Sequence, residues 1–259
     1  MTKILFIPDS QVKPGDDLGF LRSIGRYILD KKPDIIVHAG DFADMQSLSS
    51  YDKGKRSYEG RRYKADIKAA HEGMEALLGP LRDYNLMRVR NKKSPYRPRM
   101  VLTLGNHENR INRTIDDEPL LDGTISTDDL MYAQYGWEVY PFLEVVVIEG
   151  IAFAHYFTTG AMGRPASSAQ AMLNKKHMSC IAGHQQGRQS ATGVKADGRQ
   201  ITAIIAGSCY EHDEDYLGPQ GNKHWHGVIM LHNVEDGEFD ECFVPLHYIN
   251  EKYGELIVA

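Results

Sequence analysis

Six residues that can bind a metal or transfer a proton stand where short apolar runs of this chain end. They are Asp9, Asp41, Asn106, His107, His155 and His184. Taken singly, each has an ordinary explanation, since polar turns follow most strands and a histidine such as His155 is more often packed in a core than bound to a ligand. Taken together, carboxylates, imidazoles and an amide from separate runs make a mixed oxygen and nitrogen ligand set.

This ligand set favours a divalent metal. Carboxylate oxygens and imidazole nitrogens suit Mn²⁺, Mg²⁺, Fe²⁺ or Zn²⁺, and they do not suit soft thiolate chemistry. Two metals about 3.5–4 Å apart need a bridging carboxylate, and Asp41 is the natural candidate. Gly40, Gly105 and Gly183 each precede one of the polar residues, which allows tight turns and a close approach of the backbone to a ligand.

The first hundred residues predict alternating strands and helices. Apolar runs at 3–8, 34–41 and 99–105 are expected strands, and Leu21, Ile24 and Ile28 recur at helical spacing within 17–31. A second helix is expected over 59–90, broken or kinked at Gly79-Pro80. The order β-α-β-α-β is typical of a mostly parallel sheet, whose carboxyl edge is where ligands bind.

The second half of the chain is richer in strands. Residues 142–157 predict two strands joined at Glu149-Gly150, and 164–177 predict a short helix. Further strands are expected at 178–184, 201–208, 226–234 and 240–248. These strands favour a second, more antiparallel sheet. We therefore expect residues 1–259 to form a single α/β domain, with two packed sheets, helices outside and a basic helical segment at about 51–100.

Composition excludes several classes of protein. Apolar residues make up 42% of the 259, enough for a core, yet no run reaches the roughly 18 apolar residues of a membrane span. The apolar stretch at the start is too short for a signal peptide. Cys180, Cys209 and Cys242 are far apart in the sequence. A reducing, cytoplasmic setting is therefore expected, with no membrane partner and no disulfide framework.

Charge is unevenly distributed along the chain. The net charge is −5, but residues 51–100 hold 14 Lys and Arg against 6 Asp and Glu. Within 51–64, three tyrosines alternate with basic residues, a mixture that suits the phosphates and bases of single-stranded DNA or RNA. Arg61, Arg62 and Lys64 are the predicted substrate contacts. A solvated loop and helix start would carry the same letters equally well.

The motifs, in their order, resemble the calcineurin-like metallophosphoesterase family. They are Asp-x-Gln at Asp9, Gly-Asp-x-x-Asp at Asp41, Gly-Asn-His-Glu at 105–108, and then His155 and His184. Gly-Asn-His-Glu is the most specific of them and is intact. The resemblance covers about residues 3–210, and "IPDSQVKPG" and "GHQQG" are similar to members encoded by bacteriophages. It implies an αββα fold of two sheets flanked by helices, in agreement with the pattern of predicted elements.

The resemblance also implies a role for each motif residue. Asp9 would bind a first metal and Asp41 would bridge two. The second metal would be held by Asn106, His155 and His184. His107 would stand beside the scissile phosphate and protonate the leaving oxygen or steady the transition state, tuned by Glu108 or Asp44, and Arg110 would bind a phosphate oxygen. Asp41, His107 and Arg110 are thus the implied catalytic residues.

Two positions depart from the family pattern. Gln11 and Gln186 stand where the family carries histidines, and both of those histidines serve the first metal. An amide oxygen is a harder and weaker donor than imidazole. We therefore expect one tight site and one weaker site, the weaker holding Mn²⁺ or Mg²⁺, with Mn²⁺ the preferred ion overall. The alternative is that the two glutamines ligate nothing.

The expected activity is metal-dependent phosphoester hydrolysis. Protein phosphatases that resemble this family carry Arg-Gly after Gly-Asp-x-x-Asp, whereas Met45-Gln46 follows here. This difference favours a phosphodiesterase or nuclease acting on nucleic acid, in the host cytoplasm if the chain is phage-encoded. Two alternatives remain: a phosphomonoesterase on nucleotides or phosphoproteins, and a non-catalytic binding protein on a decayed scaffold. Residues 210–227 are expected to form a loop that shapes access rather than a further metal site.

Overall fold

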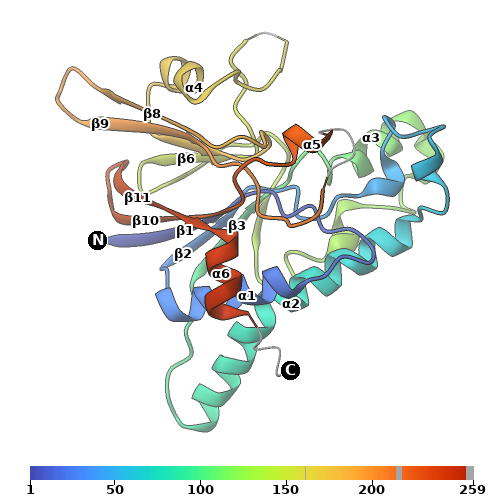
Figure 1. Cartoon of the computed structure of the whole chain (residues 1–259), viewed down its shortest axis with the longest axis horizontal. Coiled ribbons are helices and arrows are strands. Elements are labelled where there is room, and N and C mark those ends of the chain that lie inside the picture. Colours follow the sequence, from blue (N-terminus) through green and yellow to red (C-terminus); the bar gives the residue numbers. More distant parts are fainter. Residues whose placement is uncertain (161, 214–217, 255–259) are drawn as a thin grey trace.

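Two mixed sheets pack face to face in the computed structural model, which describes residues 1–160, 162–213 and 218–254. Figure 1 shows the layers: helices α1, α2 and α6 on one side, two sheets in the middle, and α4 on the other side. The predicted αββα sandwich is confirmed. The helices are α1 Gly19–Lys31, α2 Tyr63–Arg90, α3 Arg110–Asp117, α4 Ala169–Lys176, α5 Gly218–Gly221 and α6 Leu246–Tyr253.

The first sheet has the strand order β11-β10-β1-β2-β3-β4. Neighbours from β1 to β4 run parallel, and β10 and β11 extend the sheet as antiparallel strands. Their bounds are β1 Thr2–Ile7, β2 Ile35–His38, β3 Arg99–Thr103, β4 Glu138–Tyr140, β10 Gly227–Glu235 and β11 Glu238–Pro245. Assigning β10 and β11 to the second sheet was therefore wrong, since β10 pairs with β1 at the far end of the sequence.

The second sheet has the order β5-β6-β7-β9-β8. Its outer pairs are antiparallel and its inner pairs, β6 with β7 and β7 with β9, are parallel. The expectation of a more antiparallel sheet is thus only half correct. The bounds are β5 Val146–Ile148, β6 Ile151–Ala154, β7 Cys180–Ala182, β8 Gln189–Val194 and β9 Gln200–Ile205.

Strand β1 shows how the layers share the core. Ile4 and Phe6 face the second sheet and pack with its apolar residues, including Phe153, whose ring stacks on Phe6 at 5.9 Å between centroids. Leu5 and Ile7 face the opposite way and pack under the helices. Because alternate side chains of a strand point to opposite faces, a wholly apolar strand buried on both faces is what this position requires.

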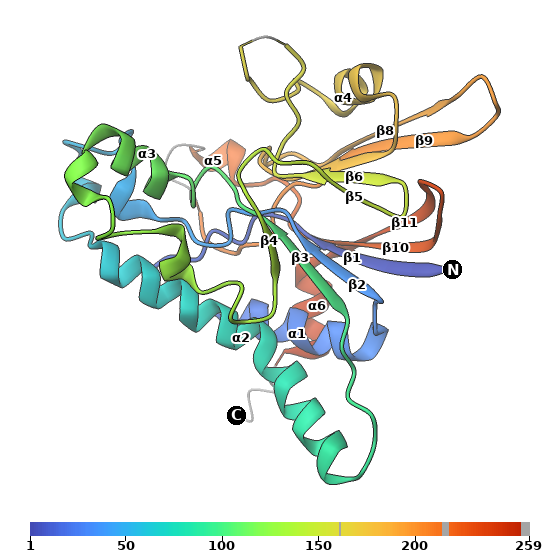
Figure 2. The same cartoon turned by 180° about the vertical axis from the view of Figure 1, so that it is seen from behind.

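Helix α2 continues through Pro80 and is not broken by it. Figure 2 shows its ribbon changing direction part of the way along, as expected where proline removes one hydrogen bond of the helix. Helix α1 crosses close by at Gly25, where a Cβ atom would lie 2.3 Å from the Leu77 carbonyl oxygen. Packing against α1 thus supports the helix at this point. The helix begins at Tyr63 rather than at 59.

Candidate metal centre

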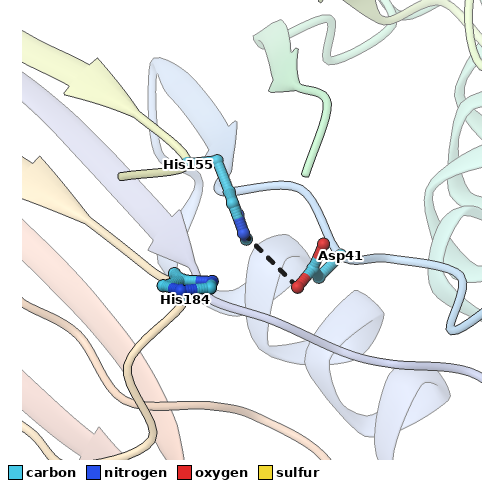
Figure 3. A group of neighbouring side chains, drawn as sticks. All are labelled: Asp41, His155 and His184. Atoms are coloured by element: carbon cyan, nitrogen blue, oxygen red, sulfur yellow. Dashed lines mark ion pairs between the residues drawn. The ribbon is translucent and has the colours of Figure 1, made fainter. Parts of the chain in front are cut away.

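All of the predicted ligands lie at one edge of the sandwich. Strands β1, β2 and β3 of the first sheet and β6 and β7 of the second end there, and each is followed by one of the predicted residues. Figure 3 shows Asp41, His155 and His184 pointing toward one another from three different elements. The carboxyl ends of parallel strands meet at a common edge, which brings together residues that are up to 175 positions apart, as Asp9 and His184 are.

One part of the centre, which we call the histidine end, consists of Asp41, Asn106, His155 and His184. One ligand atom each from Asp41, His155 and His184 lie within 4.8 Å of one another. His155 Nε2 is 3.3 Å from Asp41 Oδ2 and 2.9 Å from Asn106 Oδ1. His155 Nδ1 donates to the Ala39 carbonyl at 2.9 Å, which directs Nε2 at the cluster.

The other part, the glutamine end, consists of Asp9, Gln11 and Gln186. Both carboxylate oxygens of Asp9 accept the His184 backbone N–H, at 3.0 and 3.1 Å, so this end adjoins the histidine end. Gln11 Oε1 is buried and has no hydrogen-bond donor among the described residues. Gln186 Oε1, by contrast, accepts a 2.7 Å bond from the Tyr210 hydroxyl. The amide oxygens of the two glutamines therefore differ in whether a described protein donor already bonds to them.

The donor atoms fit a divalent cation. A buried carbonyl oxygen without a donor costs free energy unless a partner satisfies it, and Gln11 Oε1 lies in the same cluster of strand ends as two buried carboxylates, Asp9 and Asp41. Carboxylate, imidazole and amide donors together match manganese, magnesium, iron or zinc better than any soft ion. The residues of the histidine end supply the denser group of donors.

Glycine turns allow the close approach that this centre needs. A Cβ atom on Gly105 would lie 2.0 Å from Asp41 Oδ1, and one on Gly183 would lie 2.3 Å from Asp9 Oδ1. Gln11, Asp41 and His184 themselves adopt left-handed backbone conformations, with φ of 42°, 48° and 67°. The backbone thus turns sharply at each of these three positions.

Glu108 is the important residue whose role the sequence did not reveal. Its fully buried carboxylate accepts the backbone N–H groups of residues 41–43 and of Gly105, at 2.7 to 3.1 Å, and the Tyr132 hydroxyl at 3.3 Å. One side chain therefore ties the turn after β2 to the turn after β3. The Gly-Asn-His-Glu motif includes Glu108 but does not show that its carboxylate bonds to the turn after β2.

His107 is tuned by Asp44 rather than by Glu108. His107 Nδ1 lies 2.5 Å from Asp44 Oδ1, while His107 Nε2 lies 3.7 Å from Asp41 Oδ2. Burial opposes ionisation of Asp44, but His107, with Lys13 and Arg110, holds the pKa of that carboxyl at about 2. Burial likewise opposes the charged form of His107, but Asp41 and Asp44 outweigh it and raise its pKa.

Comparison with known proteins identifies the family. Residues 2–179 match the family model for calcineurin-like phosphoesterases. The chain belongs to this family. It is also similar to the gene 54 proteins of Mycobacterium phages L5 and D29, with 36% and 35% identity over 80 residues. That stretch is 31% of this chain and 30% of each phage protein, so the match spans less than a third of the relatives' length.

A solved structure aligns with this chain over most of its length. It is a conserved uncharacterised protein from Streptococcus pneumoniae, described as a predicted phosphoesterase. The alignment covers 95% of this chain and 90% of that one, with 11% identity and a TM-score of 0.39. The predicted membership of the family, and the predicted likeness to phage proteins, are both confirmed by these comparisons.

A hollow of about 640 Å³ opens beside His107. Of the three predicted substrate contacts, Arg61 lines it, whereas Arg62 and Lys64 do not. Arg61 donates to the Gln46 carbonyl at 3.1 Å and to Asp52 Oδ2 at 2.9 Å. The sequence did not single out Lys13 and Lys55, which also line this hollow. Substrate contact by Arg61, Arg62 and Lys64 stays a prediction.

Residues 210–227 fall partly outside the described part of the chain, which omits 214–217. Tyr210 stacks on His212 at 4.5 Å between ring centroids. Ser208 Oγ lies 2.9 Å from His224 Nε2 and 3.2 Å from His226 Nδ1. The histidines of this segment are therefore held by a hydroxyl and an aromatic ring, an arrangement consistent with a structured loop.

Proposed function

We propose that this chain hydrolyses phosphodiester bonds of nucleic acid with the help of divalent metal, Mn²⁺ being the preferred ion. The observation that carries the proposal is the convergence of Asp41, His155 and His184 within 4.8 Å, with His107 Nε2 3.7 Å from Asp41. Asp41 would bridge two ions, with Asn106, His155 and His184 completing the tight site. Asp9, Gln11 and Gln186 would complete the weaker one.

Bound metal would supply a water of lowered pKa and neutralise charge on the phosphoryl oxygens. His107 would then protonate the leaving oxygen through Nε2, because Nδ1 is committed to Asp44. Arg110 Nη2 lies 3.2 Å from His107 Nε2, and Arg110 Nη1 donates to the Asp44 carbonyl at 2.8 Å. Arg110 is thereby held where a phosphate oxygen would approach His107.

A diester is favoured over a phosphoprotein by the wall of the hollow. The residue after Asp44 is Met45, in place of the arginine expected in protein phosphatases, and besides Arg110 the cations that line the hollow are Lys13, Lys55 and Arg61. These side chains line the same hollow as His107, where they could contact the remainder of a longer anion. No helix of the described residues is long and apolar enough to cross a membrane. We propose the host cytoplasm as the place of action.

The test is hydrolysis of bis-p-nitrophenyl phosphate with added Mn²⁺. Wild type should be active, and Asp41→Asn should be inactive because the bridging carboxylate is lost. The exposed Asp122→Asn is the matched control and should retain wild-type activity.

A non-catalytic binding protein is the second candidate, because the Tyr210 hydroxyl already occupies Gln186 Oε1. If the wild type hydrolyses neither diesters nor monoesters faster than Asp41→Asn does, that result would support the binding protein and overturn the enzyme.

A further inference from the structure

Two hollows flank one short segment beside the metal centre. The larger is lined by His107, and a smaller one of about 300 Å³ is lined by Asn106. Ser49, Tyr51 and Arg110 line both. Since Asn106 and His107 are consecutive residues of the turn after β3, the two hollows meet at the metal centre. We call the segment 48–53 that separates them the ridge.

Each hollow carries one more cation than carboxylates among its lining residues. The larger has Lys13, Lys55, Arg61 and Arg110 against Asp44, Asp52 and Asp213. The smaller has Lys53, Arg110 and Arg113 against Asp117 and Glu118. Asp52 also lies 3.0 Å from Lys55 Nζ and 2.9 Å from Arg61 Nη1, and so positions both cations. Because Arg110 belongs to both sets, the two hollows together carry a single excess positive charge, which suits a short stretch of nucleic-acid backbone better than a dense polyanion.

Tyr51, on the ridge, is exposed to an unusual degree for an aromatic residue. Its exposed fraction is 72%, and Lys55 Nζ lies 3.6 Å from its ring centroid. The two other tyrosines of this segment are used internally: the hydroxyl of Tyr58 donates to the Ser47 carbonyl at 2.6 Å and that of Tyr63 to Asp129 at 2.6 Å. Of the three tyrosines in 51–64, Tyr51 alone has its ring largely open to solvent.

We propose that Tyr51 is a stacking platform for a nucleobase of single-stranded nucleic acid. The strand would run across the ridge, with its scissile phosphate at the metal centre and a neighbouring nucleotide in each hollow. Lys55 Nζ lies over one face of the ring, so the base would stack on the opposite face and the ammonium would stand near the adjoining phosphate. A single strand is required because a base paired within a duplex presents no free face to stack on. This inference rests on the proposed diesterase activity and adds the substrate class.

Matched substrates separate base stacking from phosphate binding. We would compare an oligothymidylate with an abasic oligonucleotide of the same length, with Mn²⁺ present. Tyr51→Ala should raise KM for the oligothymidylate roughly five- to a hundredfold and leave kcat nearly unchanged, since one stacked base is lost. Tyr51→Phe, which keeps the ring, should stay close to wild type. The abasic strand should be cleaved equally by wild type and Tyr51→Ala.

Tyr248→Ala is the matched control, because Tyr248 is an exposed tyrosine on α6 that lines neither hollow. An equal KM increase for the abasic strand, or no increase for either strand, would overturn the stacking platform. If wild type cleaves no diester, the proposed activity fails, and fluorescence anisotropy of labelled oligothymidylate then tests the platform separately. Binding weakened by Tyr51→Ala but not by Tyr51→Phe would support it, and binding indifferent to Tyr51 would overturn it as well.

Discussion

The histidine end and the glutamine end of the candidate centre rest on the same kind of turn but offer a metal very different atoms. At both ends a glycine precedes or faces the carboxylate, at Gly105 against Asp41 and at Gly183 against Asp9. At the histidine end, a backbone carbonyl orients His155 toward the cluster. At the glutamine end, the Gln11 amide oxygen has no donor within the described part of the chain, and that of Gln186 accepts a bond from Tyr210. Backbone geometry is therefore shared, and side-chain chemistry alone distinguishes the two ends.

Removing a donor from the histidine end should have the largest effect. His155→Ala takes away a fully buried candidate ligand, and we expect loss of the tightly bound metal and roughly a thousandfold loss of diester hydrolysis, because bound metal supplies several kcal/mol to such reactions. Asp9→Asn should cost clearly less. Metal content by mass spectrometry and kcat on bis-p-nitrophenyl phosphate measure this, with exposed His247→Ala as control. Equal losses for His155→Ala and Asp9→Asn would abolish the distinction between the ends.

Replacing Glu108 should destabilise the turns after β2 and β3, which carry Asp41 and Asn106 of the histidine end. Glu108→Gln puts an amide nitrogen where an oxygen now accepts N–H groups of residues 41–43 or Gly105. We expect about 3 kcal/mol of lost stability, or roughly 6–12 °C in Tm, because hydrogen bonds to a buried charged group are lost. Calorimetric unfolding measures the shift. An unchanged Tm would mean that the two turns are held in place without Glu108.

Restoring imidazoles should bring the glutamine end closer to the histidine end. The double variant with Gln11→His and Gln186→His should bind its second Mn²⁺ at least about tenfold more tightly, which corresponds to 1.4 kcal/mol. Titration calorimetry would resolve the two sites. Tyr210→Phe, which removes the hydrogen bond from the Tyr210 hydroxyl to Gln186 Oε1, should give a smaller gain in the same direction. Two equally tight sites in the wild type would sink the idea of a weak end.

Low pH should reduce the stability of the fold through His38, a buried histidine that contacts the turns carrying Asp9 and Asp41. His38 accepts the Gly40 N–H at 3.2 Å, and its Nε2 lies 2.9 Å from Ser10 Oγ, next to Asp9. Burial lowers the pKa of His38 from 6.5 to about 3. In the unfolded chain His38 binds a proton below pH 6.5, whereas in the native state it binds one only below about pH 3. The free energy of unfolding therefore falls as pH drops through this window.

The matching variant is His38→Gln, which cannot take up that proton. Urea unfolding at pH 7 and pH 5 should show a shallower loss of stability for His38→Gln, by up to about 1.4 kcal/mol per pH unit. Identical slopes in both proteins would show that His38 is protonated equally in the native and unfolded states.

The ligand edge could be predicted from the sequence because it depends on local rules. A buried strand followed by glycine and a polar residue places that residue at the carboxyl edge, and parallel strands share this edge. The pattern therefore located Asp9, Asp41 and His184 without knowledge of their contacts. By contrast, Glu108 lies next to His107 in sequence yet bonds to the backbone of residues 41–43. The local sequence does not tell whether its carboxylate contacts His107 or the turn after β2.

Elements whose partners are distant were the ones missed. Strand β10 pairs with β1, and the apolar alternation of Gly227–Glu235 does not reveal which sheet it joins. The expected strand at 240–248 ends at Pro245, and α6 begins at Leu246, because proline has no N–H with which to continue a ladder and suits the start of a helix. Helix α3, Arg110–Asp117, buries only Ile111, so its apolar spacing is too sparse to detect.

The left-handed turns at Gln11, Asp41 and His184 have a consequence for how this protein can change. Each side chain held there is strained by roughly 1–2 kcal/mol relative to glycine, which adopts such angles freely. Glycine at these positions would relieve this backbone strain while removing the atoms that face the centre. Relaxed backbone geometry and chemistry are therefore opposed at these three residues. Selection for an unstrained backbone alone would favour glycine at these positions, and the expected cost is weaker metal binding.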